Sequence, residues 1–271
     1  MLKEKIAKIK TILACSVMAA FTGVNAAATA SETCNSVKLN GSGLWHPVSL
    51  RATEGAPLRG IFPDLAREIF KELKVETEFG SDVPWKRSFV LLDNGSIDIL
   101  TGAYRTRERF EKYGASIPVM TEEVAVFVRP DLETQPQSLE DLKDLMGLAP
   151  FGANFGEEFD EYAEKHLKIE RQPFEAFATN MRLLNEGKVD YLIIARQEGE
   201  RLTRYLGVED SLKPLSWPAA VNTLHFLFSR SSPCIDLVDA FNEVLSTQIS
   251  TGALDKIIQA YQSPEDEAPQ D

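Results

Sequence analysis

The sequence has few residues of the kinds that build metal sites or nucleophilic catalytic sites. Three cysteines and three histidines occur among 271 residues. His46, His166 and His225 lie far apart and form no H-x-x-x-H pair, and no cysteine accompanies them at the spacing of a zinc site. The sequence contains neither a G-x-S-x-G motif nor a phosphate-binding glycine loop. We therefore predict no metal site, no cofactor and no catalytic residue.

A hydrophobic run long enough to span a membrane is also missing. The apolar segment 11–24 is shorter than a membrane-spanning helix of about 20 residues. Four lysines precede it between residues 3 and 10, and two A-x-A cleavage sites follow it within residues 26–30. This pattern predicts a cleaved secretory signal peptide over residues 1–30 and hence a periplasmic protein. A retained membrane anchor is the alternative.

Positive charge is scarce in the remainder of the chain. Without residues 1–30 the protein has 25 basic and 40 acidic residues, a net charge of −15. Such a balance disfavours binding to nucleic acid or to anionic lipid. Nucleic acid is therefore excluded as a partner, although the acidic surface by itself identifies no other.

Two cysteines remain after export, because Cys15 would leave with the signal peptide. In an oxidising compartment, an even pair such as Cys34 and Cys234 can form a disulfide. We predict that bridge, with two free buried thiols as the alternative.

An internal repeat is the most informative feature that is present. Leu91–Leu100 and Leu183–Leu192 are identical at five of ten positions and lie 92 residues apart. In each copy a helix ends on a leucine pair at a glycine that can adopt a left-handed conformation, and a short strand with an aspartate follows. The repeat indicates two similar α/β lobes with a ligand site in the cleft between them. Chance recurrence of a common junction is the alternative.

Helices and strands are expected to alternate along the whole chain. The pattern predicts α/β architecture with mainly parallel sheets flanked by helices. The expected helices are 63–74, 85–93, 139–146, 175–186 and 197–206, and the expected strands include 37–39, 97–100, 124–128, 147–151, 189–194 and 221–229. The acidic, proline-containing segment 263–271 is predicted to be a disordered tail.

Two groups of residues are suited to binding a small ligand. Tyr104–Arg109 contains three arginines and follows a predicted strand, where ligands of α/β proteins collect. Arginine offers a planar pair of donors for a carboxylate or phosphate. Trp45 and Trp85 lie in or next to loops and could provide an aromatic platform. A solvated helix start and ordinary core packing are the respective alternatives.

With these features, the chain resembles the bacterial extracellular solute-binding proteins of family 3, the type II periplasmic binding proteins. The resemblance extends from about residue 37 to residue 261. It implies a two-lobed fold with two crossover hinges, in which lobe 1 comprises 34–120 plus 224–262 and lobe 2 comprises 124–220. It rests on Trp45-His-Pro47, Gly60–Leu65, Gly95–Asp98, Thr106–Arg109, Gly187–Asp190 and Gly252-Ala-Leu254.

The resemblance also implies a ligand site. Arg109 would bind a ligand carboxylate beside the strand-end residues Thr101, Gly102 and Tyr104. Trp45 and Trp85 would enclose the ligand, and the loop 152–156 would complete the anion site. In that loop the candidate contacts are Asn154 and Phe155.

The sequence departs from the family pattern where an aspartate would receive the ligand's ammonium group. That position holds Ala195, and Arg196 follows it as a further candidate for an anion contact. A buried ammonium without a partner is costly. The resemblance is therefore better evidence for an acidic group on the ligand than for an amino acid.

The function that the resemblance implies is solute capture. We expect a monomeric, non-enzymatic binding protein that closes on a small polar or anionic solute and delivers it to a membrane permease, as in ABC-type import. The alternative is an exported enzyme of the same fold, such as a dehydratase of small acids, with Glu108, Glu157 or Asp190 as its acid or base. A sensor or scaffold that binds protein is a third possibility.

Overall fold

The computed structural model describes residues 34–172 and 177–261, so the predicted signal peptide and acidic tail lie outside the described residues. The strands are β1 Ser36–Gly41, β2 Leu44–Trp45, β3 Ser49–Leu50, β4 Glu76–Phe79, β5 Ile99–Tyr104, β6 Gly114–Ala115, β7 Met120–Val128, β8 Met146–Pro150, β9 Lys168–Gln172, β10 Tyr191–Ala195, β11 Lys213–Pro214 and β12 Ala220–Phe228. The helices are α1 Ile61–Glu72, α2 Trp85–Asp93, α3 Arg107–Lys112, α4 Glu157–His166, α5 Phe177–Asn185, α6 Arg196–Leu206, α7 Leu237–Ser250 and α8 Ala253–Ala260.

One mixed sheet runs through the molecule in the order β4-β1-β5-β12-β7-β10-β8-β9. Its outer strands are parallel, since β1 pairs in parallel with β4 and β5, and β8 with β9 and β10. The two central strands, β7 and β12, are antiparallel to their neighbours and to each other. Strands β2 and β3 form a separate small pair. The α/β prediction is therefore confirmed, with an antiparallel centre that it did not include.

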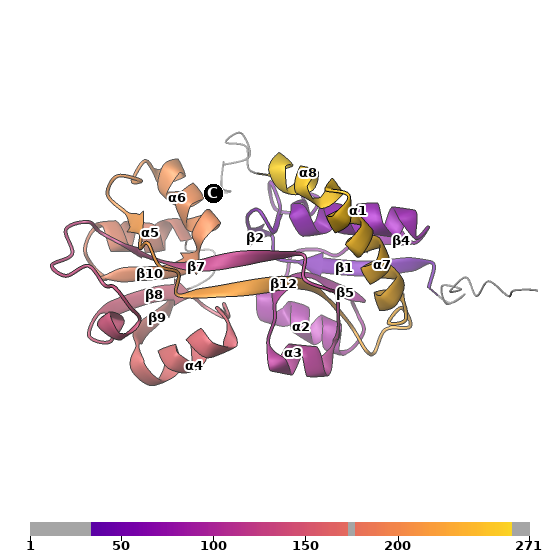
Figure 1. Ribbon diagram of the computed structural model, residues 1–271, viewed down its shortest axis with the longest axis horizontal. Coiled ribbons are helices and arrows are strands. Elements are labelled where there is room, and N and C mark those ends of the chain that lie inside the picture. Colours follow the sequence, from indigo (N-terminus) through magenta and orange to yellow (C-terminus); the bar gives the residue numbers. More distant parts are fainter. Residues whose placement is uncertain (1–33, 173–176, 262–271) are drawn as a thin grey trace, which may run out of the picture.

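The central strands connect two groups of elements (Figure 1). Strand β7 pairs with β12 over Met120–Val124 and continues beside β10, whereas β12 continues from Leu224 beside β5. We call β1–β6, α1–α3, α7 and α8 the first half, and β8–β10 with α4–α6 the second half. Within the described residues, β12 thus pairs with β5 of the first half, β7 pairs with β10 of the second half, and the pairing of β7 with β12 joins the two halves. The lobe boundaries predicted from the sequence stay a prediction.

The sequence repeat has the same local structure in both halves. Gly95 and Gly187 each have φ of 72°, which allows Ser96 and Lys188 to donate their backbone N–H groups back to the helix that precedes them, at 2.9 Å in both cases. Asp98 accepts from the backbone N–H of Lys38 at the start of β1. The predicted helix–glycine–strand junction is confirmed in both copies.

Asp190 has the same role in the second half, where it accepts from the backbone N–H of Met146 at the start of β8 at 2.8 Å. Each repeat therefore uses its aspartate to fix the neighbouring parallel strand. This structural role accounts for both aspartates without a catalytic one.

The cores lie between the sheet and its helices. In the first half, Phe62, Leu65 and Ile69 of α1 are fully buried, and α1 also packs against α7 and α8. The disulfide between Cys34 and Cys234 joins the start of β1 to the segment before α7, with 5.3 Å between the Cα atoms. The predicted bridge is therefore confirmed. Among the described residues, no helix has both the length and the apolar character needed to cross a bilayer.

Some predicted elements differ from the structure. The helix expected at 139–146 is a single 3-10 turn at Glu140–Leu142, and no side chain caps its start. The turn cannot continue because Met146 already belongs to β8. The strand expected at 97–100 extends to Tyr104, which places Thr101 and Gly102 inside β5 rather than after it.

Candidate functional site

A small cavity lies where the two halves meet. Its volume is about 60 Å³, enough for about two water molecules at ~30 Å³ each. The first half contributes four predicted residues, which are Trp45, Trp85, Tyr104 and Arg109. The second half contributes two more, Asn154 and Phe155. Residues that the sequence analysis did not assign to the site complete its lining: Ser42, Pro150, Ala153 and Ala195.

Arg109 is held in place by the start of α3. Thr106 is the N-cap of this helix, and its hydroxyl accepts from the backbone N–H of Arg109 at 3.2 Å. The guanidinium donates to the backbone carbonyl of Tyr104 at 2.7 Å and lies 4.8 Å from the centre of the Phe89 ring. Arg109 forms no ion pair with a carboxylate of the described residues.

The charge of Arg109 is therefore available to a ligand. Burial lowers the pKa of its guanidinium to about 10, against the opposing effects of Tyr113 and Asp160. The group still carries its positive charge at neutral pH. A cation that is partly buried and lacks a counter-ion is stabilised by an incoming carboxylate, which can accept two of its N–H groups.

Aromatic rings form the wall of the cavity on the side of the first half. Trp45 lies edge-to-face against Trp85, with ring centres 6.1 Å apart, and against Tyr104 at 5.2 Å. Trp85 makes a similar contact with Phe89 at 5.2 Å. Such contacts favour one ring arrangement over others, so the wall is formed before any ligand arrives.

Glu122 of β7 connects this wall to the central strands, and the sequence analysis missed it. Its carboxylate accepts from the indole N–H of Trp45 at 3.2 Å and from the hydroxyl of Tyr104. Burial raises the pKa of Glu122 to about 7, although the hydrogen bonds from Tyr104 and Trp45 oppose that rise. The available signal was a glutamate pair at 122–123 beside the apolar run 124–128.

The second half contributes a loop to the cavity wall, and hydrogen bonds to Asp160 fix the conformation of this loop. Asp160 accepts from the backbone N–H of Phe155 at 3.2 Å and from the side-chain amide of Asn154. Asn222 of β12 donates to the backbone carbonyl of Phe155 at 2.9 Å. The side chain of Asn154 therefore shapes the loop, and the ring of Phe155 lies among the cavity lining.

Three predicted site residues do not line the cavity. The hydroxyl of Thr101 donates to the backbone carbonyl of Asn40 at 3.0 Å, inside the sheet. A Cβ atom at Gly102 would lie 2.6 Å from Val48, so the backbone of β5 needs glycine for close packing there. Arg196 is paired with Glu123, with 2.5 Å between Nε and Oε2. As ligand contacts, all nine residues stay predictions.

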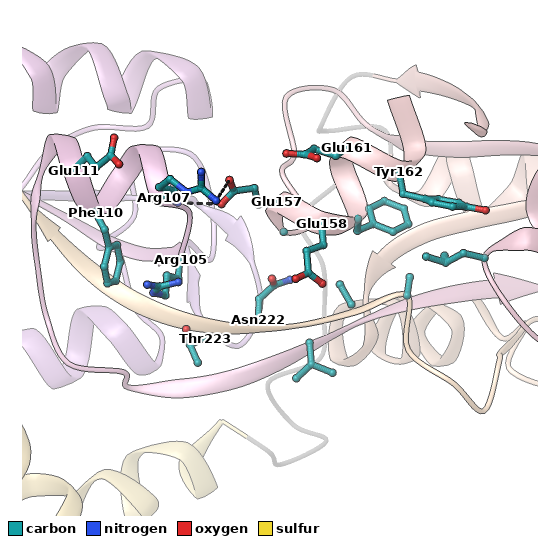
Figure 2. A pocket seen from close by; sticks show the side chains of 16 residues that line it. Arg105, Arg107, Phe110, Glu111, Glu157, Glu158, Glu161, Tyr162, Asn222 and Thr223 are labelled. Carbon is teal, nitrogen blue, oxygen red and sulfur yellow. Dashed lines mark hydrogen bonds and ion pairs between the residues drawn. The ribbon is translucent and has the colours of Figure 1, made fainter. Parts of the chain in front are cut away.

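A larger groove of about 1150 Å³ lies beside the cavity, between α3 and α4 and over β12. Figure 2 shows Arg107 and Glu157 facing each other across it, with further glutamates along the wall formed by α4. The backbone N–H of Arg107 donates to Glu157 at 3.1 Å, and their charged groups are 3.9 Å apart. Both side chains are well exposed, so this link between the halves is weak.

The acids proposed for an enzymatic alternative have other partners or lie at the surface. Glu157 contacts Arg107, Asp190 holds the start of β8, and Glu108 is exposed on α3. Within residues 34–172 and 177–261, no group of three or more histidine, cysteine, aspartate or glutamate side chains could hold a metal ion.

Solved structures with this fold include an ancestral arginine-binding protein bound to arginine, with 20% identity, a TM-score of 0.69 and coverage of 84% of this chain and 99% of that chain. A structure described under glutathione import via GshT and the cystine ABC importer TcyBC of Streptococcus mutans has 22% identity, a TM-score of 0.70 and coverage of 84% and 95%. An ancestral amino acid-binding protein described as a precursor of cyclohexadienyl dehydratase has 22% identity, a TM-score of 0.66 and coverage of 84% and 95%.

These likenesses confirm the mixed α/β fold of type II periplasmic binding proteins. Comparison with curated proteins finds no match. The sequence model of the bacterial extracellular solute-binding proteins, family 3, matches residues 38–264, which is most of the chain. The chain therefore belongs to the bacterial extracellular solute-binding proteins, family 3.

Proposed function

We propose that this solute-binding protein captures a small carboxylate-bearing solute between its two halves, with Arg109 as the carboxylate contact. The observation that carries the proposal is the unpaired guanidinium of Arg109 at an aromatic-lined cavity. Trp45 and Trp85 would enclose the apolar part of the solute. Arginine and glutathione appear in the descriptions of structures with this fold, which supports a ligand of the amino-acid or small-peptide kind.

Capture requires the halves to move apart and close. The cavity of about 60 Å³ is far smaller than the ~300 Å³ or more of common ligand pockets, so the described arrangement must open to admit a solute. Two of the contacts between the halves are exposed and would break easily: the pair of Arg107 and Glu157, and Lys86 at 4.8 Å from the Phe151 ring. Strands β7 and β12 would act as the hinge, at 119–124 and 219–224.

The proposed setting is the periplasm. Residues 1–30 would direct export and be removed, and the closed form would be recognised by a membrane permease. Support comes from the family, which is described as extracellular, and from the mention of an ABC importer for one structure of the same fold. In this setting we expect a monomer with lobe 1 at 34–120 plus 224–262 and lobe 2 at 124–220.

One observation favours an enzyme as the second candidate. A carboxyl with a pKa of about 7, as in Glu122, suits a general acid or base, and one structure of the same fold is described as a dehydratase precursor. Both carboxylate oxygens of Glu122 are engaged by Trp45 and Tyr104, and Glu122 does not line the cavity. Binding without turnover is therefore the better-supported reading.

Calorimetry with the purified protein and the common L-amino acids tests the proposal. At least one should bind with micromolar affinity, about −8 kcal/mol, and should be recovered unchanged after long incubation. The binding proposal would be contradicted by the absence of binding at millimolar concentration. Conversion of the bound compound, followed by chromatography, would favour the enzyme instead.

A further inference from the structure

Glu122 lies next to the cavity, on the face of the sheet that borders it. In the β7–β10 pairing, Val124 is opposite Ala195, which lines the cavity. Alternate residues of a strand share a face, so Glu122 is on the same face as Val124 and is a diagonal neighbour of Ala195. Its two hydrogen-bond donors, Trp45 and Tyr104, also line the cavity. Cavity-lining residues therefore lie on several sides of this carboxylate.

The carboxylate of Glu122 has no cationic partner among the described residues. The side chain is only 4% exposed, yet neither a lysine nor an arginine forms an ion pair with it. The other buried glutamate on this side, Glu198, is paired with Arg201 at 2.6 Å. A buried carboxylate without a counter-ion is costly when ionised, and a nearby cation would stabilise it.

Arg109 and Glu122 contact opposite ends of one residue. Arg109 donates to the backbone carbonyl of Tyr104, whereas Glu122 accepts from the phenol of the same tyrosine. The unpaired cation of Arg109 thus lies at the cavity at one end of Tyr104, and the carboxylate of Glu122, which has no counter-ion, lies behind the Trp45 and Tyr104 rings at the other end. A solute that carries both charges could satisfy the two ends at once.

We propose that Glu122 is the residue that selects solutes carrying a cationic group as well as a carboxylate. The inference rests on the proposed function, because it presumes that Arg109 receives the carboxylate. It identifies the solute as an amino acid or a related zwitterion rather than a simple organic acid. Glu122 acts both through its own charge and by fixing Trp45 and Tyr104.

Three five-carbon acids form a matched set of probes. Pentanoate lacks an ammonium group, 2-aminopentanoate carries it beside the carboxylate, and 5-aminopentanoate carries it at the far end. The parent should bind one of the amino acids at least tenfold more tightly than pentanoate in calorimetric titrations. Glu122→Gln should abolish that preference and leave pentanoate binding within about threefold, because glutamine can still hydrogen-bond with Trp45 and Tyr104.

The matched control is Glu123→Gln, which removes the same charge from the next residue of β7. Glu123 is half exposed and pairs with Arg196, away from the cavity lining. This variant should keep the preference of the parent. If Glu122→Gln keeps it too, the proposal is overturned. If Glu122→Gln weakens all three probes equally, Glu122 only positions the rings, and the selection by charge is overturned.

A second measurement gives its main result on the parent protein and so protects the test against misfolding of a variant. At pH 7 the bound ammonium should favour the ionised form of Glu122, so binding of the preferred amino acid should release about half a proton, because a carboxyl with a pKa of about 7 is half protonated at that pH. Titration in two buffers of different ionisation enthalpy measures this release. Tyr104 of β5 and Glu198 of α6 are the other titratable groups that act on Glu122. Neither the Glu122→Gln variant nor pentanoate should give the release.

The outcomes also separate this inference from the proposed function. A parent that binds pentanoate as well as both amino acids, without proton release, would overturn the role of Glu122 and leave carboxylate capture standing. A parent that binds none of the three probes would contradict carboxylate capture and this inference together.

Discussion

Glu122 illustrates at the residue scale how a single side chain can serve a site at some cost to the fold. Its carboxylate is buried without a cation, and burial raises its pKa from the ordinary 4.5 to about 7. Between these pH values the folded protein therefore binds a proton that the unfolded chain has released. The stability that this proton contributes is complete below pH 4.5 and is lost as the pH rises through about 7.

This linkage predicts a pH dependence that Glu122→Gln removes. Between pH 4.5 and 8 the parent should lose up to about 3 kcal/mol of unfolding free energy relative to this variant, at about 1.4 kcal/mol per pKa unit. Urea unfolding across this pH range measures the difference. Glu123→Gln should follow the parent. Parallel pH profiles for the parent and Glu122→Gln would mean that Glu122 stays ionised throughout.

The sequence predicted some residues of the site and not others, for a physical reason. Arg109 and the two tryptophans belong to local motifs, such as the Thr106 cap that starts α3, and local motifs are readable from sequence. Glu122 depends on the pairing of β7 with β12, where it lies opposite Asn222, and no local pattern encodes that register. Thr101 and Gly102 were assigned to the site by the resemblance, and as ligand contacts they stay predictions, since β5 extends through them to Tyr104.

At the scale of the element, the two glycine junctions have the same backbone conformation in different surroundings. Alanine at either position must adopt a φ of 72°, which costs about 1–2 kcal/mol. A Cβ at Gly95 would lie 3.0 Å from the backbone carbonyl oxygen of Ser231, whereas a Cβ at Gly187 would lie 3.6 Å from Arg129. The first contact is too close and involves backbone, and the second is an ordinary contact with a side chain.

We therefore expect Gly187→Ala to lower the unfolding free energy by about 1–2 kcal/mol and Gly95→Ala to lower it by more. The pair can be compared directly in urea unfolding, each variant serving as the control for the other. Equal losses would show that conformational strain alone matters at both junctions. A larger loss for Gly187→Ala would contradict the packing described around Ser231.

Helices and strands were predicted correctly where the residues that determine them all lie within the same short segment of the sequence. The repeat showed both helix–glycine–strand junctions because glycine and the leucine pair mark them locally. The helix expected at 139–146 was wrong because the chain must reach the pairing of Met146 in β8, and only the turn Glu140–Leu142 forms before it. Tertiary pairing overrode local propensity at that point.

At the scale of the whole molecule, one sheet joins the two halves, and one disulfide links two segments that are far apart in the sequence. The bridge joins residues 200 positions apart, and closure of so long a loop stabilises the folded state by roughly 5 kcal/mol in the chain-entropy model. The repeat and the cysteine count predicted two α/β units and the bridge. The antiparallel centre of β7 and β12 was not predicted, since it depends on how the two units are joined.

The central claim is that a solute carboxylate binds Arg109 between the halves. Calorimetry of Arg109→Ala with the amino acid that the parent binds best tests it most directly. Loss of a charged, partly buried contact costs about 2–5 kcal/mol, so affinity should fall by a factor of about 30 or more, at about 1.4 kcal/mol per tenfold. Arg87→Ala, an exposed position on α2, should bind like the parent. Arg109→Ala that binds as tightly as the parent would contradict the account.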